Sequence, residues 1–295
     1  MKIAITGGTG LVGTALGRAL TSRGEETRIV SRSAGADRIV WTPTQGLQPA
    51  DALSGCDAVV HLAGAGVADR RWNRTRKKEI LESRRWTTQT VVEGLRHAEP
   101  RPKVLISASA VGFYGDSGSE TRTEASAAGD DFLAQVCVAW EADAKPAASL
   151  GVRLVTARIG IVLSTEGGAL ARMQPAFKLG AGGPLGDGTQ YMPWIHIDDL
   201  VAGLLHLLDD PEACGVYNLS APAPVDNATF TAALGRTLSR PTLLRMPRFA
   251  LRGMFGELAD VLLAGQRAIP ERLQRAGFAF RHPEIDGALA DLLRL

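Results

Sequence analysis

A glycine-rich turn close to the N-terminus constrains the fold of this chain more than any other feature. Residues 6–13 read Thr-Gly-Gly-Thr-Gly-Leu-Val-Gly, after a β-type run over 2–6 and before a helical apolar pattern over 11–23. Such glycines permit a tight turn, close approach of the backbone to a pyrophosphate, and packing of helix on strand. The turn therefore predicts a dinucleotide site at the start of a helix, with a purely structural turn as the alternative. The contacts expected here are Gly7, Thr9, Gly10, Leu11, Val12 and Gly13.

Strands and helices alternate along the chain beyond this turn. We expect further strands at 27–31, 57–62, 103–107 and within 152–163, and long helices over 73–98 and 131–149. This alternation predicts an α/β fold, a Rossmann-type doubly wound parallel sheet that helices cover on both faces. The dinucleotide-binding domain is expected to span residues 1–220.

The pattern changes after about residue 221, where we expect a small, mainly helical subdomain over 221–295 that closes the substrate cleft. Asn227 is expected to cap a helix that runs to residue 238. Pro247 and Pro270 stand where two more helices would start. The glycine-rich segment 179–190 predicts a mobile loop beside the cleft.

Composition excludes several classes of partner. The chain of 295 residues carries 33 basic and 31 acidic side chains, a net charge of +2, so nucleic acid and anionic membranes are not expected partners. Its three cysteines form no CxxC pair, and no apolar run approaches the ~18 residues that span a bilayer. We expect a reduced, cytoplasmic protein with a small-molecule substrate and no metal site, and we leave a homodimer open.

The end of the second strand predicts which nucleotide binds. NAD-preferring proteins usually carry Asp or Glu about 20 residues beyond the glycines, bound to the ribose 2′-hydroxyl. This chain has Ser31-Arg32-Ser33 at that place. Arg32 can bind a 2′-phosphate with its guanidinium while Ser31 donates a hydrogen bond, a contact of about 1.5–3 kcal/mol. NADP(H) is the predicted cofactor, and a solvated loop arginine is the alternative.

Several segments together resemble a known superfamily. Residues 6–13, 57–64 (DAVVHLAG) and 107–115 (SASAVGFYG) are similar to successive signatures of extended short-chain dehydrogenases/reductases and epimerases. Residues 194–200 (WIHIDDL) are similar to the segment in which the chain of these enzymes returns to the core. The tail, with its Gly-Gln-Arg at 265–267, resembles the small C-terminal domain of an atypical NAD(P)-dependent, epimerase-like branch, sometimes labelled cell division inhibitor.

The resemblance implies NADP(H) binding and a set of contact residues. These are Ser31, Arg32, Leu62, Ala63, Gly64, Glu79, Arg84 and Val162. Glu79 and Arg84 would reach the cofactor from the helix over 73–98. The alternative for this region is a solvated face, because the preceding run 70–78 (RRWNRTRKK) is strongly basic.

The catalytic Tyr/Lys pair of this superfamily is missing. The pair stands four residues apart on a helix, where the ammonium lowers the pKa of the phenol. The residues four positions after Tyr114, Tyr191 and Tyr217 are Gly118, Ile195 and Ala221. If Glu141 aligns with the acidic residue that follows the motif, Leu133 and Cys137 occupy the two positions. Neither side chain can perform this chemistry.

Ser109 and Tyr114 are the remaining catalytic candidates, as a hydroxyl donor and an acid near the carboxyl end of a strand. A packed aromatic in a turn is the alternative for Tyr114. His196 is either a proton shuttle or a structural histidine, and Asp198 or Asp199 is expected to cap the next helix. The predicted function is an NADP(H)-binding oxidoreductase or epimerase-like enzyme acting on a small metabolite. A non-catalytic NADP(H) redox sensor is the alternative.

Overall fold

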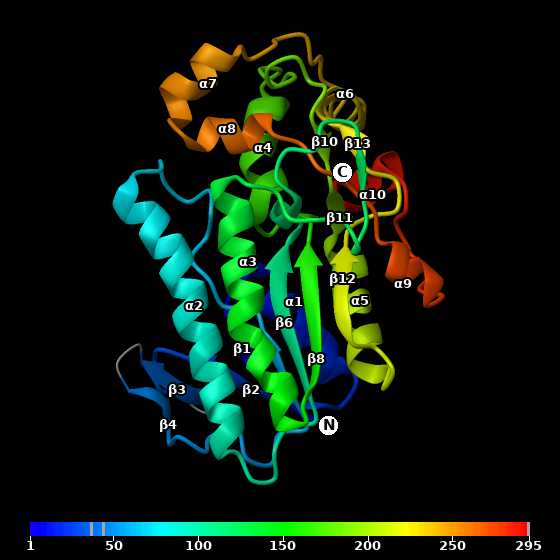
Figure 1. Cartoon of the computed structure of the whole chain (residues 1–295). Coiled ribbons are helices and arrows are strands. Elements are labelled where there is room, and N and C mark those ends of the chain that lie inside the picture. The colour runs from blue at the N-terminus through cyan, green and yellow to red at the C-terminus, as the bar shows by residue number, and fades with distance from the viewer. Residues whose placement is uncertain (36–37, 43–44, 294–295) are drawn as a thin grey trace.

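A large, mostly parallel sheet forms the centre of the molecule (Figure 1). The structure is a computed structural model that describes residues 1–35, 38–42 and 45–293. The strands of the sheet are β1 (Lys2–Thr6), β2 (Glu26–Ser31), β3 (Arg38–Thr42), β4 (Gly46–Gln48), β5 (Ala58–His61), β6 (Val104–Ala110), β8 (Arg153–Ile159) and β12 (Gly215–Leu219). Their order is β12-β8-β6-β5-β1-β2-β3-β4, and β4 is antiparallel to β3. The strand order reverses beside β1, which is where open α/β sheets bind ligands.

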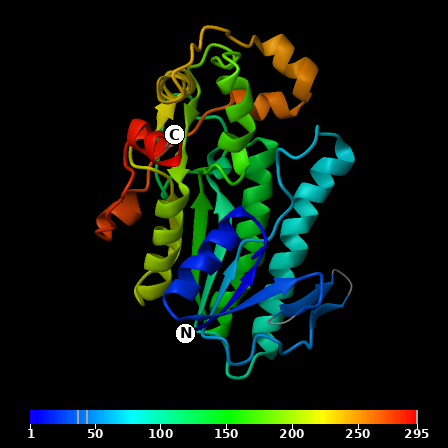
Figure 2. The ribbon, with the colours of Figure 1, turned by 180° about the vertical axis from the view of Figure 1, so that it is seen from behind.

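Helices cover both faces of this sheet. Helices α1 (Leu11–Ser22) and α5 (Ile197–Asp209) lie on one face, and α2 (Arg74–His97) and α3 (Phe132–Ala144) lie on the other (Figures 1 and 2). Alternate residues of each strand enter the two cores. Ile3 and Ile5 pack in the core with α1 and α5, while Ala4 packs in the core with α2. The predicted doubly wound sheet is confirmed.

The first strand–turn–helix unit matches the sequence prediction closely. The run expected over 152–163 instead divides at Gly160, where a Cβ atom would lie 2.2 Å from the Pro193 carbonyl oxygen. Beyond this break β9 (Ile161–Leu163) leaves the large sheet and pairs with β11 (Trp194–His196). Two more small sheets join β10 (Tyr191–Met192) to β13 (Val225–Asp226) and β7 (Thr121–Arg122) to β14 (Arg267–Ala268).

The C-terminal part is mainly helical and lies at the carboxyl end of the sheet (Figure 1). Its helices are α6 (Asn227–Thr237), α7 (Arg248–Phe255), α8 (Leu258–Leu263), α9 (Glu271–Arg275) and α10 (Ile285–Leu292), and α4 (Gly168–Lys178) lies beneath it. The short 3-10 helices η1 (Val111–Tyr114) and η2 (Lys145–Leu150) follow β6 and α3. The division at residue 220, and the mobility of 179–190, stay predictions.

One predicted cap of this part is wrong. Asp226, not Asn227, caps α6, because its side chain accepts the backbone N–H of Thr229. The Asn227 carboxamide oxygen instead accepts the N–H of Leu185 in the preceding loop. Pro247 and Pro270 directly precede α7 and α9 as expected. No helix within the described ranges has the length and apolar character that crossing a bilayer requires.

Candidate functional site: a nucleotide cleft at the strand switch point

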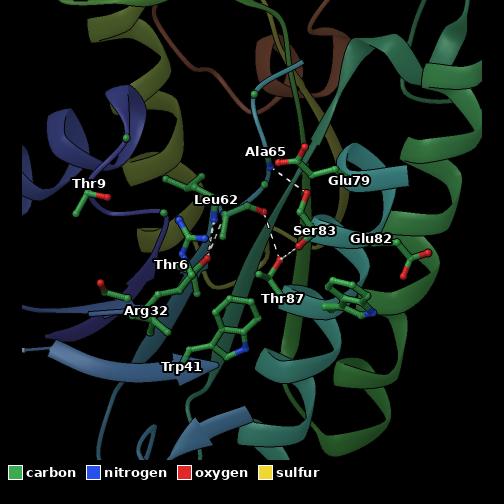
Figure 3. A pocket seen from close by; sticks show the side chains of 18 of the residues that line it. Thr6, Thr9, Arg32, Trp41, Leu62, Ala65, Glu79, Glu82, Ser83 and Thr87 are labelled. Atoms are coloured by element: carbon green, nitrogen blue, oxygen red, sulfur yellow. Dashed lines mark hydrogen bonds between the residues drawn. The ribbon is translucent and has the colours of Figure 1, made fainter. Parts of the chain in front are cut away.

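A cavity of about 940 Å³ opens where β1, β2 and β5 end, with α2 as its far wall (Figure 3). Most of the predicted cofactor contacts line it. These are Gly7, Thr9, Gly10, Ser31, Arg32, Leu62, Ala63, Gly64 and Glu79. Leu11, Val12, Gly13, Arg84, Val162, Ser109 and Tyr114 are not among the lining residues. Their predicted contacts are untested, and the roles described below come from their own packing.

The glycine-rich turn has the form that a pyrophosphate cradle requires. Gly7 has a φ of +68°, and a Cβ atom there would lie 2.9 Å from the Leu62 carbonyl carbon. At Gly13 a Cβ atom would lie 2.3 Å from the Gly7 carbonyl oxygen, so this glycine permits the contact of α1 with the turn. Gly10 is the N-cap of α1, and no side chain caps the helix. The first N–H groups of α1 therefore remain available to an anion.

A buried hydrogen-bond chain fixes the turn against β5 and α2. Thr6 Oγ1 accepts the N–H groups of Leu62 and Ala63, so its proton goes to His61 Nδ1, 2.6 Å away. His61 Nε2 then donates to Thr88 Oγ1 (2.9 Å), which itself donates to the Arg84 carbonyl oxygen. Burial, with a smaller effect of the Arg84 charge, lowers the pKa of His61 to about 3. His61 is neutral, and its role is to hold the floor of the cleft.

We expect His61 to make the fold sensitive to acid. Its pKa is about 3 in the folded chain against an ordinary 6.5, so the unfolded chain takes up the proton first as pH falls. The contribution of the neutral ring is complete above pH ~6.5 and is lost between pH ~6.5 and ~3, with about 2 kcal/mol lost at pH 5. Urea unfolding of wild type and His61→Asn at pH 7 and pH 5 measures this. Equal losses in both proteins would show that another group carries the effect.

The end of β2 presents cations to the cleft rather than a carboxylate. Arg32 is exposed and points into the cavity (Figure 3). Ser31 Oγ accepts the N–H of Ser33 (3.1 Å), which leaves its own proton for an acceptor in the cleft. The carboxylates that line the cavity, Asp69, Glu79 and Glu82, come from the loop after β5 and from α2. Ser31 and Arg32 therefore line the same cavity as the glycine-rich turn, and their contacts with a cofactor stay predictions.

Two hydroxyl groups of α2 that the sequence prediction missed face the loop after β5. Ser83 Oγ accepts the N–H of Ala65 (3.0 Å) and so holds the loop (Figure 3). Thr87 Oγ1 donates to the Ser83 carbonyl oxygen (2.7 Å) and lies 3.5 Å from that of Ala63. They stand four residues apart, so both lie on one face of the helix. This spacing of four residues is the sequence pattern from which both hydroxyl groups could have been predicted. Trp41, from β3, also lines the cavity (Figure 3).

Arg84 also holds the loop after β5 by a hydrogen bond. Its Nη1 donates to the carbonyl oxygens of Ala65 and Ile80 (3.0 and 2.9 Å), and its guanidinium lies 4.9 Å from the Trp140 ring centroid. A Cβ atom at Gly64 would lie 3.1 Å from the Arg84 side chain. Arg84 thus fixes the backbone that lines the cleft.

The basic run 70–78 is not a uniformly solvated face. The Arg76 side chain is only 5% exposed, and it forms ion pairs with Glu79 and Asp69. Arg70 also pairs with Glu79, and Arg76 is the main cause of the lowered pKa of Glu79. Lys77 forms an ion pair with Glu257 between α7 and α8. Part of the run is therefore buried or paired, and Lys77 connects α2 to the C-terminal part by an ion pair.

The two residues predicted to occupy the positions of the missing pair both lie on α3, and their equivalence to the Tyr and Lys stays a prediction. Leu133 and Cys137 stand on α3, and Leu133 Cβ is 3.5 Å from a Cβ built at Gly112, just beyond β6. Burial, reinforced by the charge of Glu141, raises the pKa of the Cys137 thiol to about 11. Ser109 Oγ donates to Glu141 Oε1 (2.7 Å). A thiol that stays protonated cannot replace the ammonium of the usual pair.

Glu141 belongs to a buried polar network at the end of β6 and β8. Arg158 Nε and Nη2 donate to its two oxygens (2.8 and 2.9 Å), and both side chains are almost fully buried. Tyr114 is 2% exposed, and its hydroxyl donates to Asn218 Oδ1 (2.7 Å) and accepts from Arg158 Nη1 (3.1 Å). Burial raises the pKa of Tyr114. This geometry favours the packed-aromatic interpretation, and the catalytic roles of Tyr114 and Ser109 stay predictions.

His196 anchors the C-terminal segment. Its Nδ1 accepts the N–H of Asp198 (3.0 Å), so His196, and neither of the two aspartates predicted, caps α5. Its ring stacks on His282 at 3.9 Å, and Nε2 lies 3.4 Å from Asp291 Oδ2. Asp199 accepts the backbone N–H of His282 (2.8 Å). The ligand atoms of His196, Asp198, His282 and Asp291 lie within 4.8 Å of one another. Because Nδ1 accepts a backbone N–H, the proton of neutral His196 is on Nε2, which therefore has no lone pair to offer a metal ion while His196 caps α5.

Comparisons with known proteins show to which family the chain belongs. The model of the "NAD dependent epimerase/dehydratase family" matches residues 3–220, and a "domain of unknown function (DUF1731)" matches 246–292. The chain belongs to the NAD dependent epimerase/dehydratase family. This family member is 46% identical to epimerase family protein Mb2239 of Mycobacterium bovis over 290 residues, which cover 97% of the chain and 96% of the relative. It is 39% identical to human epimerase family protein SDR39U1, covering 99% of the chain and 100% of the relative.

A solved structure extends this likeness to three dimensions. Human SDR39U1 (isoform 2), crystallised with NADPH, superposes on this epimerase-family chain with a TM-score of 0.93 at 38% identity. The match covers 100% of the chain and 99% of the human structure. The UDP-N-acetylglucosamine 4-epimerase of Bacillus cereus shares the fold, with a TM-score of 0.79 at 17% identity. The resemblance inferred from the sequence motifs is confirmed.

Proposed function

We propose that this chain is an NADP(H)-dependent oxidoreductase of the epimerase-like type that acts on a small metabolite. The observation that carries the proposal is the pairing of an uncapped α1 N-terminus with Arg32 at the end of β2, in one cavity. The first suits a pyrophosphate and the second a 2′-phosphate. The NADPH in the crystals of human SDR39U1 supports the same choice.

The residues present fit such a cofactor. The N–H groups of the turn over 7–13 would hold the pyrophosphate, and Ser31 with Arg32 would hold the adenosine phosphate. Leu62 and Ala63 would contact the nucleoside, on backbone that Thr6 and Ser83 fix by hydrogen bonds. When bound, the cofactor supplies or accepts a hydride.

The chain itself must position the substrate and handle its proton. Ser109 is the hydroxyl that lies beside the positions of the missing pair, and its proton is held by Glu141 at 2.7 Å. Turned toward a substrate oxygen, the Ser109 hydroxyl would donate a hydrogen bond to it, with Arg158 holding Glu141 in place, and the proton that the reduced oxygen takes up would come from water. Loss of NADPH absorbance with carbonyl compounds and nucleotide sugars tests this. Turnover that persists in Ser109→Ala would exclude this role, and tight NADPH binding without any turnover would favour the sensor.

We expect wild type to bind NADPH at least tenfold more tightly than NADH, and Arg32→Ala to remove most of this preference. One charge-assisted contact contributes about 1.5–3 kcal/mol, which corresponds to roughly ten- to hundredfold in affinity. Calorimetric titration with both cofactors measures the two dissociation constants. No binding of either cofactor by folded wild type would refute the proposed function, and an unchanged ratio in Arg32→Ala would refute the role of this arginine.

A further inference from the structure

A second arginine lies at the same end of the cleft. Arg38 is the first residue of β3, which runs parallel to β2, and it lines the same cavity as Arg32. Its N–H donates to the Gly35 carbonyl oxygen (3.3 Å). A Cβ atom at Gly35 would lie 2.9 Å from Arg38 Cδ and 3.1 Å from its Nε. The Arg38 side chain therefore lies over the turn that carries Arg32, in space that the glycine leaves open.

The cations of this cavity differ in their partners. At the α2 end, Arg70, Arg76 and Lys78 line the cavity together with three carboxylates, those of Asp69, Glu79 and Glu82. Arg70 and Arg76 form ion pairs with Glu79, and Lys78, which forms no ion pair among the described residues, lies on the same helix as Glu79 and Glu82. Arg32 and Arg38 form no ion pair with any residue that the structure describes. The uncompensated positive charge of the cleft is therefore concentrated where β2 and β3 meet.

We propose that Arg38 is a second determinant of cofactor choice, which binds the 2′-phosphate of NADP(H) together with Arg32. A phosphate monoester carries about −1.5 to −2 charges near neutral pH, more than one guanidinium neutralises. Two guanidinium groups from adjacent strands match that charge and offer two sets of donors. The inference rests on the proposed function, because it requires NADP(H) in this cleft.

The test compares Arg38→Ala with wild type in calorimetric titrations with NADPH, NADH, 2′,5′-ADP and 5′-AMP. We expect the dissociation constants of NADPH and 2′,5′-ADP to rise roughly ten- to hundredfold, and those of NADH and 5′-AMP to stay within about twofold. Arg74→Ala, an exposed arginine of α2 that does not line the cavity, is the matched control and should change none of them.

A second variant protects the test against misfolding. Gly35→Ala keeps the charge of Arg38 but displaces its side chain, so it should weaken 2′,5′-ADP selectively as well. Selective loss in either variant supports the inference. If folded Arg38→Ala binds NADPH and NADH with wild-type affinities, the inference is overturned while the proposed function stands. If wild type itself binds neither NADPH nor 2′,5′-ADP, both are overturned.

Discussion

The Gly13→Ala variant is expected to lose roughly a hundredfold in affinity for NADPH while keeping the fold of the sheet. A methyl group at this position would lie 2.3 Å from the Gly7 carbonyl oxygen and 2.6 Å from Gly8 Cα. Both obstacles are backbone atoms, so α1 must move away from the turn, and its N–H groups then no longer face the pyrophosphate. Overpacking of this kind lowers folding stability by about 1–3 kcal/mol. The affinity falls because N–H groups lose their hydrogen bonds to a charged pyrophosphate, and about 3 kcal/mol for such a contact corresponds to roughly a hundredfold in a dissociation constant. Calorimetric titration with NADPH measures the change.

Gly17→Ala provides the control on the same helix. A Cβ atom at Gly17 meets nothing within 4 Å, and alanine favours a helix interior by roughly 0.5–1 kcal/mol over glycine. This variant should therefore bind NADPH like wild type and melt at the same or a slightly higher temperature. Wild-type affinity in Gly13→Ala would show that the turn does not hold the cofactor, whatever the stability of the variant.

The sequence predicted best those parts of the site that lie within one short segment. The turn over 6–13 and the cationic end of β2 are each formed by consecutive residues, and the spacing of glycines and the place of Arg32 already specify their chemistry. The parallel sheet with helices on both faces followed from the alternation of strands and helices, because parallel strands require crossover connections. The order of its strands was not predicted. Short sequence motifs were sufficient for these two parts of the site, because each part is formed by consecutive residues.

The remaining features depend on residues that are far apart in the chain. Nothing in the sequence pairs Glu141 with Arg158, and their contact arises only once α3 packs against β6, the neighbour of β8. The capping of α5 by His196 was missed because two aspartates, the usual capping residues, stand two and three positions after it. The division of the 152–163 run depended on the Pro193 carbonyl beside Gly160, a contact that periodicity cannot reveal.

We expect Glu141→Ala to lower the stability of the folded protein more than any other single substitution named above. It leaves the Arg158 guanidinium, whose side chain is 5% exposed, without its carboxylate, and it removes the acceptor of the Ser109 hydroxyl. Removal of one partner of a buried ion pair costs about 3–5 kcal/mol, out of a total stability of about 5–15 kcal/mol. We expect the melting temperature to fall by roughly 10 °C, as measured by circular dichroism during thermal unfolding.

Two matched variants separate the possible causes of this loss. Glu166→Ala removes an equally bidentate pair with Arg18, but both of those side chains are more than half exposed, so water screens the pair and its loss should lower the melting temperature far less. The double variant Glu141→Leu/Arg158→Met removes both buried charges at similar volume and should recover most of the lost stability. If the melting temperature of Glu141→Ala falls no further than that of Glu166→Ala, water must reach the Arg158 guanidinium and compensate its charge. A double variant as unstable as Glu141→Ala would mean that the stability comes from the hydrogen bonds to Ser109 and Tyr114, and not from compensation of a buried charge.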